Sequence, residues 1–419
     1  MSRMARKWWS SSIFLVALTL LTACGGHQSS PQSWAERLQQ DPAPDSIAFR
    51  YARLIHVEQR DDCRIVYIDN PWKPGKTLHT YVLVDRGEGE EVRGQNNPLT
   101  PHPSPLTTQQ TVVRVPLQRS VVFTSVHCAL LDQLQATAQV AGVADLKYIK
   151  VPFVQEGVKS GTLADCGDGM SPLVEKIIDA GADAILLSPF ENSGGYGRLE
   201  HIDIPIIECA EYMETSPLAR AEWMRFYGML YGKEKEADSL FREVETRYDT
   251  LRQLATTGGS HPSPLTSHPS PLTSHPSPLT SHPSVVMDKM AGSVWYVPGG
   301  RSTIGQMLAD AGAEYPWADD NHSGSLQLSF ETVLERAGHC QLWLLRYDSP
   351  QPLTLSALLS EKDGYRMMKA KDIYACNVST SMFYEETPFR PDLLLQDFIK
   401  ILHPNIPNLP PLRYYQKVE

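Results

Sequence analysis

Two kinds of hydrophobic spacing alternate along most of this chain of 419 residues. Short apolar runs such as DAILL at 183–187 are typical of buried strands. Between them, stretches such as PLVEKIIDA at 172–180 place apolar residues at helical spacing. Strands that alternate with helices indicate a parallel or mostly parallel sheet, so the pattern predicts an α/β fold.

The expected elements form two groups, with a long helical region between them. In the first group we expect strands at 64–69, 78–84, 112–115, 120–124, 183–187 and 204–208, and helices at 127–139 and 172–180. In the second group we expect strands at 285–288, 293–297, 341–346 and 372–376, and helices at 303–311, 330–337 and 391–402.

The helical region begins at Ser216-Pro217, where proline suits the first turn of a helix. Gly232 is expected to break it, and residues 233–255 then keep Leu240, Val244 and Leu251 on one face. At about 1.5 Å per residue this second helix spans about 35 Å, the width of a domain. The predicted order is therefore lobe, long helix, lobe.

Two proline-rich tracts interrupt the pattern. Residues 102–108 read HPSPLTT, and residues 261–281 repeat HPSPLTS three times. Proline supports neither a helix interior nor a central strand, so we expect both tracts to lie in surface loops. Five of the 13 histidines lie in these tracts and their continuation at 282–284. Single imidazoles separated by stiff prolines converge poorly on one ion, so we predict no metal site there.

The N-terminus resembles a bacterial lipoprotein signal. Arg3, Arg6 and Lys7 precede an apolar stretch at 13–21, which is too short to span a bilayer as about 20 residues would. The stretch ends in Leu-Thr-Ala-Cys, which is similar to a lipobox, and this resemblance implies a lipid on Cys24. No acidic run follows Cys24. We expect an inner-membrane anchor that faces the periplasm, and a cell-surface location stays open.

These features divide the chain into six expected segments. They are a lipoprotein signal peptide (1–23), a flexible tether (24–44), an N-terminal α/β lobe (45–232, with an insert at 96–110), a backbone helix (233–256), a repeat insert (257–284) and a C-terminal α/β lobe (285–419).

The net charge argues against nucleic acid as a partner. It is −10, and it becomes −13 when the three basic residues of 1–23 are removed. Phosphate binding needs clustered Lys and Arg, whereas an acidic chain suits a monomer outside the cytoplasm. Six cysteines besides Cys24 are scattered, without zinc-like spacing. In an exported protein they could form a disulfide or two or remain buried thiols.

Four stretches carry a resemblance to a known family. They are RSVVFT at 119–124, SPLVEKIIDAGADAILL at 171–187, GGRSTIGQMLADAGA at 299–313 and SFETVLERAGHCQLWLL at 329–345. In their order they resemble the periplasmic binding proteins that carry iron-siderophores, haem and cobalamin for ABC importers. Ala182 departs from the pattern, because the family often has proline there.

The resemblance covers about 112–402 and implies two Rossmann-like lobes joined by a single long backbone helix, with a ligand cleft between the lobes. It further implies that the protein captures a metal chelate (an iron-siderophore, haem or cobalamin) and delivers it to a membrane permease and its ATPase. No intrinsic cofactor and no enzymatic activity are expected.

Candidate ligand-binding residues follow from the loops at the carboxyl ends of strands, where α/β sheets bind ligands. They are Thr124, His127, Asp168 and Met170 from the N-terminal lobe, and Trp295, Tyr296, Arg301, Trp317, Phe383 and Tyr384 from the C-terminal lobe. An aromatic-rich cleft with an arginine suits a large, flat or anionic chelate. Arg301 also precedes an expected helix start, where backbone amides favour an anion.

Two glutamates are expected to contact the permease. In the family that the chain resembles, one exposed glutamate per lobe docks onto permease arginines. Matching by motif places these at Glu191 and Glu331, with Glu222 as an alternative.

Two other functions stay open at this point. A tetrapyrrole chelatase-like enzyme could share the two-lobed fold, although the sequence contains no G-x-S-x-G, Walker A, H-E-x-x-H or G-x-G-x-x-G motif. A binding protein for a bare metal ion would need three or four convergent ligands, and outside the repeats we expect only His127 near the cleft. We therefore predict no catalytic and no metal-ligating residues.

Overall fold

The computed structural model describes residues 45–60, 63–87, 110–191, 195–257 and 282–419. These residues belong to one compact unit. Cys24, the segments at 1–23 and 24–44, and most of both proline-rich tracts lie outside the described residues. Among the described helices, none is both long enough and apolar enough to cross a membrane.

The first part of the chain forms a five-stranded sheet of its own. Its strands, in spatial as well as chain order, are β1 (Asp45–Ile47), β2 (Ile55–Gln59), β3 (Cys63–Asp69), β4 (Thr77–Asp85) and β5 (Gln110–Val115). All neighbours are antiparallel except β4 and β5, which are parallel. The hydrophobic pattern predicted β3, β4 and β5, but it predicted neither β1 and β2 nor a separate sheet.

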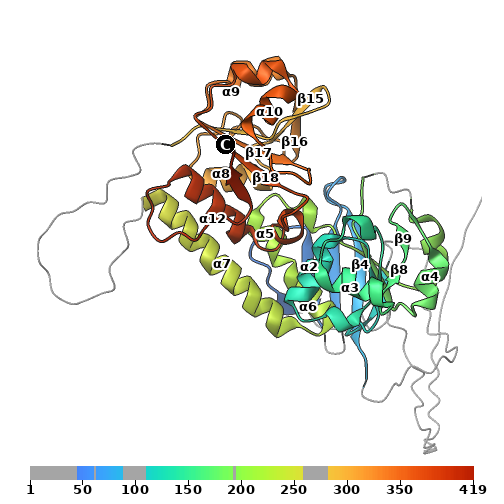
Figure 1. The fold of residues 1–419 in the computed structure, drawn as a ribbon. Coiled ribbons are helices and arrows are strands. Elements are labelled where there is room, and N and C mark those ends of the chain that lie inside the picture. The colour runs from blue at the N-terminus through green and yellow to red at the C-terminus, as the bar shows by residue number, and fades with distance from the viewer. Residues whose placement is uncertain (1–44, 61–62, 88–109, 192–194, 258–281) are drawn as a thin grey trace, which may run out of the picture. The chain divides into compact units, whose positions relative to one another are not determined.

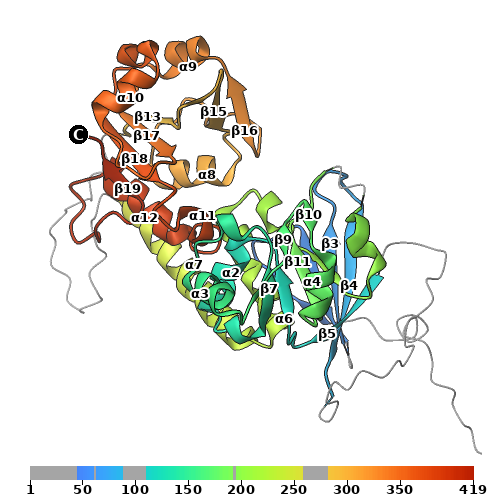
Figure 2. The ribbon, with the colours of Figure 1, turned by 45° about the vertical axis from the view of Figure 1, so that its right-hand side comes forward.

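A second sheet is parallel throughout and carries the expected strand–helix alternation. Its spatial order is β12 (Ile206–Glu208), β11 (Ala184–Leu187), β6 (Ser120–Val122), β7 (Val140–Val143) and β8 (Ala164–Asp165). The helices α2 (Ser125–Gln133), α3 (Pro152–Ser160) and α4 (Val174–Asp179) connect these strands (Figure 2). All four residues of β7 and of β11 are buried, as expected for strands covered on both faces.

The C-terminal part contains two sheets rather than one. Strands β13 (Val285–Met287), β17 (Leu342–Tyr347) and β18 (Asp372–Asn377) are parallel, and β19 (Tyr415–Lys417) adds an antiparallel edge. Strands β14 (Met290–Ala291), β15 (Val294–Pro298) and β16 (Ser325–Leu328) form a small antiparallel sheet. The strand expected at 293–297 therefore exists, but it lies outside the parallel sheet.

The C-terminal part contains the three expected helices and two further ones, at 355–361 and 383–386, that were not expected. They are α8 (Thr303–Asp310), α9 (Phe330–Ala337), α10 (Leu355–Glu361), α11 (Phe383–Glu386) and α12 (Pro391–Leu402). The bounds of α9 and α12 match the expected helices at 330–337 and 391–402.

The helical region between the two groups of strands consists of α5 (Pro217–Glu222), α6 (Met224–Tyr231) and α7 (Glu234–Thr257). Gly232 ends α6 in the left-handed conformation, with φ 63°, as its position in the sequence predicted. Helix α12 packs along α7 (Figure 1), where Arg390 donates to Glu243 at 3.1 Å. The long helix thus contacts the closing helix of the chain.

Several expected boundaries differ from those in the structure. Helix α2 ends at Gln133 rather than at 139, because Gln135 takes a left-handed conformation with φ 56° and the Ala136 amide donates back to Leu131. The repeat insert is shorter than 257–284, because Thr257 belongs to α7 and Ser284 forms a β-bridge with Glu314.

The six cysteines of the described residues are all buried, and none forms a disulfide. They are Cys63, Cys128, Cys166, Cys209, Cys340 and Cys376. Of the two possibilities that the sequence left open, the structure therefore has the buried thiols.

Candidate functional site

A pocket of about 270 Å³ gathers residues from α2, α5, α8, β17, α11 and α12. Most of its wall is apolar, and two arginines interrupt it. The lining residues are Val126, Pro217, Arg220, Thr303, Ile304, Met307, Arg346, Phe383, Tyr384, Thr387, Pro388 and Pro391. An apolar pocket with a few convergent polar groups is the usual form of a small-molecule site.

Arg220 is the first of the two arginines, and its Nε has no acceptor among the described residues. It lies in α5, and its Nε is buried without a hydrogen-bond partner among the described residues. Burial lowers the pKa of Arg220, although Glu211 and Tyr227 nearby act in the opposite direction. A buried donor without a partner costs about 1–3 kcal/mol, and more for a charged group. Because Arg220 lines the pocket, an anion bound there would interact favourably with its charge.

Arg346 is paired, in contrast to Arg220. It donates from Nε to Asp288 Oδ1 at 2.8 Å and from Nη2 to Asp288 Oδ2. Burial opposes the charge of Arg346, but Asp288 raises the pKa of the guanidinium above its usual value. The guanidinium carbon lies 5.8 Å from the centre of the Phe383 ring. Arg346 is thus held rigidly at the pocket wall with its charge largely balanced.

The N-terminus of α8 also faces the pocket, since Thr303, Ile304 and Met307 line it. Ser302 caps this helix, and its hydroxyl accepts from the Gly305 amide at 3.0 Å. The first turn of a helix carries a partial positive charge. This end of α8 therefore favours the same sign of ligand charge as Arg220.

A buried polar cluster lies beside Arg220. His127 Nε2 is 3.2 Å from Glu211 Oε1, and the Tyr227 hydroxyl donates to Glu211 Oε2 at 2.9 Å. The His127 and Glu211 side chains are only 1% and 2% exposed. His127 Nδ1 faces the Thr124 hydroxyl, which also caps α2. These four side chains connect α2, α6 and the turn at Glu211–Met213.

The charges within this cluster stabilise each other. Burial opposes protonation of His127, but Cys209 and Glu211 beside it raise the pKa of His127 to about 10. Burial also opposes ionisation of Glu211, but His127, Arg220 and Tyr227 lower the pKa of Glu211 below its usual value. The cluster therefore holds an imidazolium and a carboxylate at neutral pH.

Two of the expected ligand-binding residues line this pocket, namely Phe383, which is buried, and Tyr384, which is 48% exposed. Thr124 and His127 lie next to the pocket, because Val126 between them lines it, but their polar atoms belong to the buried cluster.

The other expected ligand-binding residues do not line the pocket. Trp295 is fully buried and donates to the Met287 carbonyl at 2.9 Å, and Trp317 is 3% exposed, so both pack in the core. The expectation that these two tryptophans contact a ligand therefore finds no support in the structure. Tyr296 and Arg301 are exposed, but neither lines the pocket.

Asp168 and Met170 lie in and beside a separate two-stranded hairpin, β9 (Gly167–Asp168) and β10 (Ser171–Pro172). Asp168 pairs with Lys147 at 3.4 Å, and Met170 is 79% exposed. Neither residue is among those that line the pocket.

The sequence analysis missed the two pocket arginines. Arg220 stands in LARAEWMRF, where a charged residue among helical apolar residues is also typical of a solvent-facing side. Arg346 was recognised only as the last residue of an expected strand. The position of Arg346 at the carboxyl end of a buried parallel strand could have identified it as a candidate site residue, because ligands bind at that edge of an α/β sheet.

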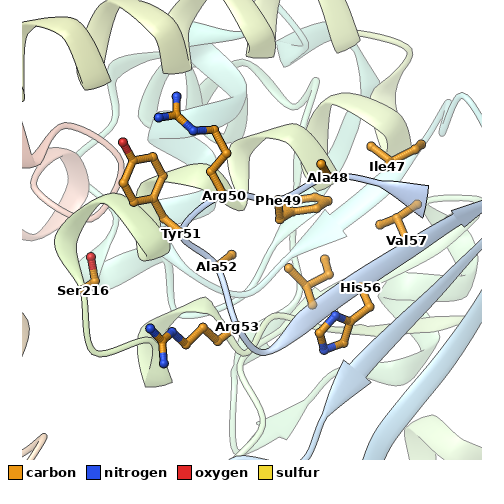
Figure 3. Close-up of a pocket in the computed structure, with 11 residues that line it drawn as sticks. Ile47, Ala48, Phe49, Arg50, Tyr51, Ala52, Arg53, His56, Val57 and Ser216 are labelled. Carbon is orange, nitrogen blue, oxygen red and sulfur yellow. The ribbon is translucent and has the colours of Figure 1, made fainter.

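A larger depression of about 610 Å³ is lined by residues 47–53 and 55–57 together with Ser216 (Figure 3). The backbone amides of this segment already have hydrogen-bond acceptors. The Glu222 carboxylate accepts from the amides of Arg50, Tyr51 and Ala52, and the Glu214 carboxylate accepts from the next two amides along the chain. With these donors satisfied, the depression offers less for a ligand than the pocket of Arg220.

The two glutamates expected to dock on a permease, Glu191 and Glu331, are both exposed. Glu331 lies in the first turn of α9, where a backbone amide and the Ser329 hydroxyl lower the pKa of Glu331. The alternative, Glu222, is wrong, because this side chain has no exposed surface and binds the backbone of residues 50–52.

No group of three or more His, Cys, Asp or Glu side chains within the described residues could hold a metal ion. The polar side chains at the pocket are arginines and hydroxyls, which suit an anionic ligand better than a bare cation.

Comparison with known proteins agrees with this architecture. Residues 121–375 match the family model described as periplasmic binding protein. An uncharacterized lipoprotein of Methanocaldococcus jannaschii is 24% identical over 303 residues, which cover 70% of this chain and 67% of the relative.

Two solved structures share the fold. A periplasmic heme-binding protein of Pseudomonas aeruginosa is 13% identical, with a TM-score of 0.51 over 72% of this chain and 98% of that chain. An ABC transporter substrate-binding protein of Listeria monocytogenes is 15% identical, with a TM-score of 0.50 over 69% of this chain and 99% of that chain. The family match begins at β6 and extends through most of β18, so it leaves out the N-terminal five-stranded sheet. The chain belongs to the periplasmic binding protein family.

Proposed function

We propose that this protein is the substrate-binding component of an ABC importer and that it holds an anionic metal chelate in the pocket of Arg220 and Arg346. The observation that carries the proposal is Arg220, a residue that lines the pocket and whose buried Nε has no acceptor among the described residues. Membership of the periplasmic binding protein family supports the class of function, and the two arginines of the pocket support an anionic ligand.

The following experiments would identify the chelate that the protein binds. Catecholate and carboxylate siderophores, haem with its propionates and cobalamin with its phosphate all present anionic oxygens that could accept from Arg220. Native mass spectrometry of freshly purified protein identifies a ligand that co-purifies. The same ligand should then stimulate ATP hydrolysis by the reconstituted importer only when the binding protein is present. Turnover of a porphyrin plus metal by the purified protein would instead favour an enzyme.

The anchor belongs to the same proposal, because an importer needs its binding protein near the membrane. The lipobox-like motif at Cys24 supports it, and so does the relative that is named a lipoprotein. We expect Cys24→Ala to abolish metabolic labelling by a fatty-acid probe and to move the protein out of the detergent phase. Unchanged labelling of that variant would contradict a lipid on Cys24.

Glu191 and Glu331 are the proposed contacts with the permease. We expect Glu191→Lys/Glu331→Lys to bind ligand normally but to stimulate ATP hydrolysis poorly, because charges across an interface steer encounter and set orientation. A matched control is Glu175→Lys/Glu335→Lys, which makes the same change of charge at two other exposed acids. Raising salt should weaken stimulation by the wild type, since exposed charges are screened within about 8 Å at physiological ionic strength. Wild-type stimulation by the reversed protein would exclude this pair.

A further inference from the structure

We propose that His127 is a positioning residue of the anion site: its imidazolium neutralises the buried Glu211 carboxylate, and Arg220 is thereby left free for the ligand. This inference rests on the proposed function, since it concerns the pocket that Arg220 lines. It gives His127 a role other than the direct ligand contact that the sequence suggested.

Glu211 is the residue that competes with a ligand for Arg220. It lies nine positions before Arg220 in the chain, and both of its carboxylate oxygens have partners in the cluster. Oε1 faces His127 Nε2 at 3.2 Å, and Oε2 accepts from the Tyr227 hydroxyl at 2.9 Å. Glu211 and Arg220 influence each other's ionisation but share no hydrogen bond among the described residues.

The position of His127 is fixed on both sides of its ring, and the buried Cys209 side chain lies beside both His127 and Tyr227. Nδ1 faces the Thr124 hydroxyl, and Nε2 faces both Glu211 and the Tyr227 hydroxyl at 2.9 Å. Because the Tyr227 hydroxyl donates to Glu211, its oxygen can accept from Nε2. Each ring nitrogen thus has an oxygen that can accept from it, and an imidazolium has two N–H donors to supply.

The charges of three side chains decide whether the pocket attracts an anion. With His127 and Arg220 positive and Glu211 negative, the group carries one net positive charge, and this charge resides at Arg220. Without His127 the buried carboxylate loses its cation. A buried charge that loses its partner is costly, so Glu211 would then pair with Arg220. That internal pair would occupy the donors that the ligand needs.

The test compares three variants in titrations with ferric citrate and with haemin. We expect His127→Gln to weaken binding by roughly tenfold or more, as expected when charge-assisted hydrogen bonds are lost. Adding Glu211→Gln to that variant should restore affinity to near the wild type, because Arg220 is again the only charge. Tyr231→Phe is the control: it removes another buried hydrogen bond, from the Tyr231 hydroxyl to Ser120 at 2.7 Å, without a change of charge. Its affinity should stay at the wild-type value.

Rescue by the second substitution separates an electrostatic role from structural damage, since the double variant has lost more buried hydrogen bonds than the single one. Wild-type affinity in folded His127→Gln, or no recovery in the double variant, would overturn the inference. If the wild type binds neither probe, the proposed ligand class is contradicted, but the inference about His127 is still testable. NMR of the ligand-free protein at pH 8 then measures the protonation state of His127. A neutral ring would overturn the inference, and an imidazolium would support it.

Discussion

Replacing Arg220 with Met should weaken binding of an anionic ligand by about 10- to 100-fold, the effect of losing charge-assisted hydrogen bonds worth about 1.5–3 kcal/mol. The same change should leave the melting temperature of the ligand-free protein unchanged or raise it. Removing a buried charge usually strands its partner, but Arg220 Nε has no partner among the described residues, and Glu211 keeps His127 and Tyr227. Calorimetric titration and thermal denaturation, with the co-purifying ligand removed, measure both quantities.

Two other arginines provide controls for this prediction. Arg336→Met removes a cation that lies over the Trp317 ring at 5.6 Å and does not line the pocket, so the affinity should not change. Arg346→Met removes the partner of Asp288, so it should lower stability as well as affinity. Unchanged affinity in Arg220→Met would place the ligand elsewhere, and the exposed Tyr296 and Arg301 would be the next positions to test.

The sequence predicted those features of the fold that depend on neighbouring residues in the chain, such as helix ends. Ser329 caps α9 by accepting from the Thr332 amide, and Pro391 begins α12 in its first turn, and both signals are readable from the sequence. Strands β1 and β19 were not predicted. Each has three residues, and β19 pairs with β18 across about 40 residues of chain, so its pairing depends on the tertiary structure.

The site was predicted less completely than the fold, because a residue type does not reveal its surroundings. Phe383 and Tyr384 were identified from an aromatic pair near the C-terminus, and both line the pocket. Trp295 had the same appearance in the sequence, but it lies in β15 with its ring 6.2 Å from that of Phe330 in the core. Arg220 looked like a surface arginine, and only the packing of α5 shows that its Nε is buried.

Replacing Glu222 with Ala should reduce the free energy of unfolding by about 3–5 kcal/mol, the cost of stranding buried partners of a removed charge. The Glu222 side chain is fully buried, and it accepts from the amides of Arg50, Tyr51 and Ala52 at 2.7–2.9 Å. Arg225 also donates to it at 3.2 Å. An alanine satisfies none of these donors. Urea denaturation monitored by circular dichroism measures the loss.

The matched control, Glu245→Ala, removes an acceptor from side chains of the same segment. Glu245 accepts from the Arg50 guanidinium at 2.5 Å and from the Tyr51 hydroxyl at 2.7 Å. Because the Arg50 side chain is 64% exposed, water can replace much of this interaction, and we expect a loss of about 0–1 kcal/mol. An equal loss in both variants would contradict a special role of the buried carboxylate.

Limited proteolysis of Glu222→Ala then shows which part of the chain is destabilised by the substitution. If cleavage of Glu222→Ala is confined to residues 45–60 while ligand affinity stays at the wild-type value, Glu222 holds residues 50–52 against α5, and the pocket of Arg220 is stable without it.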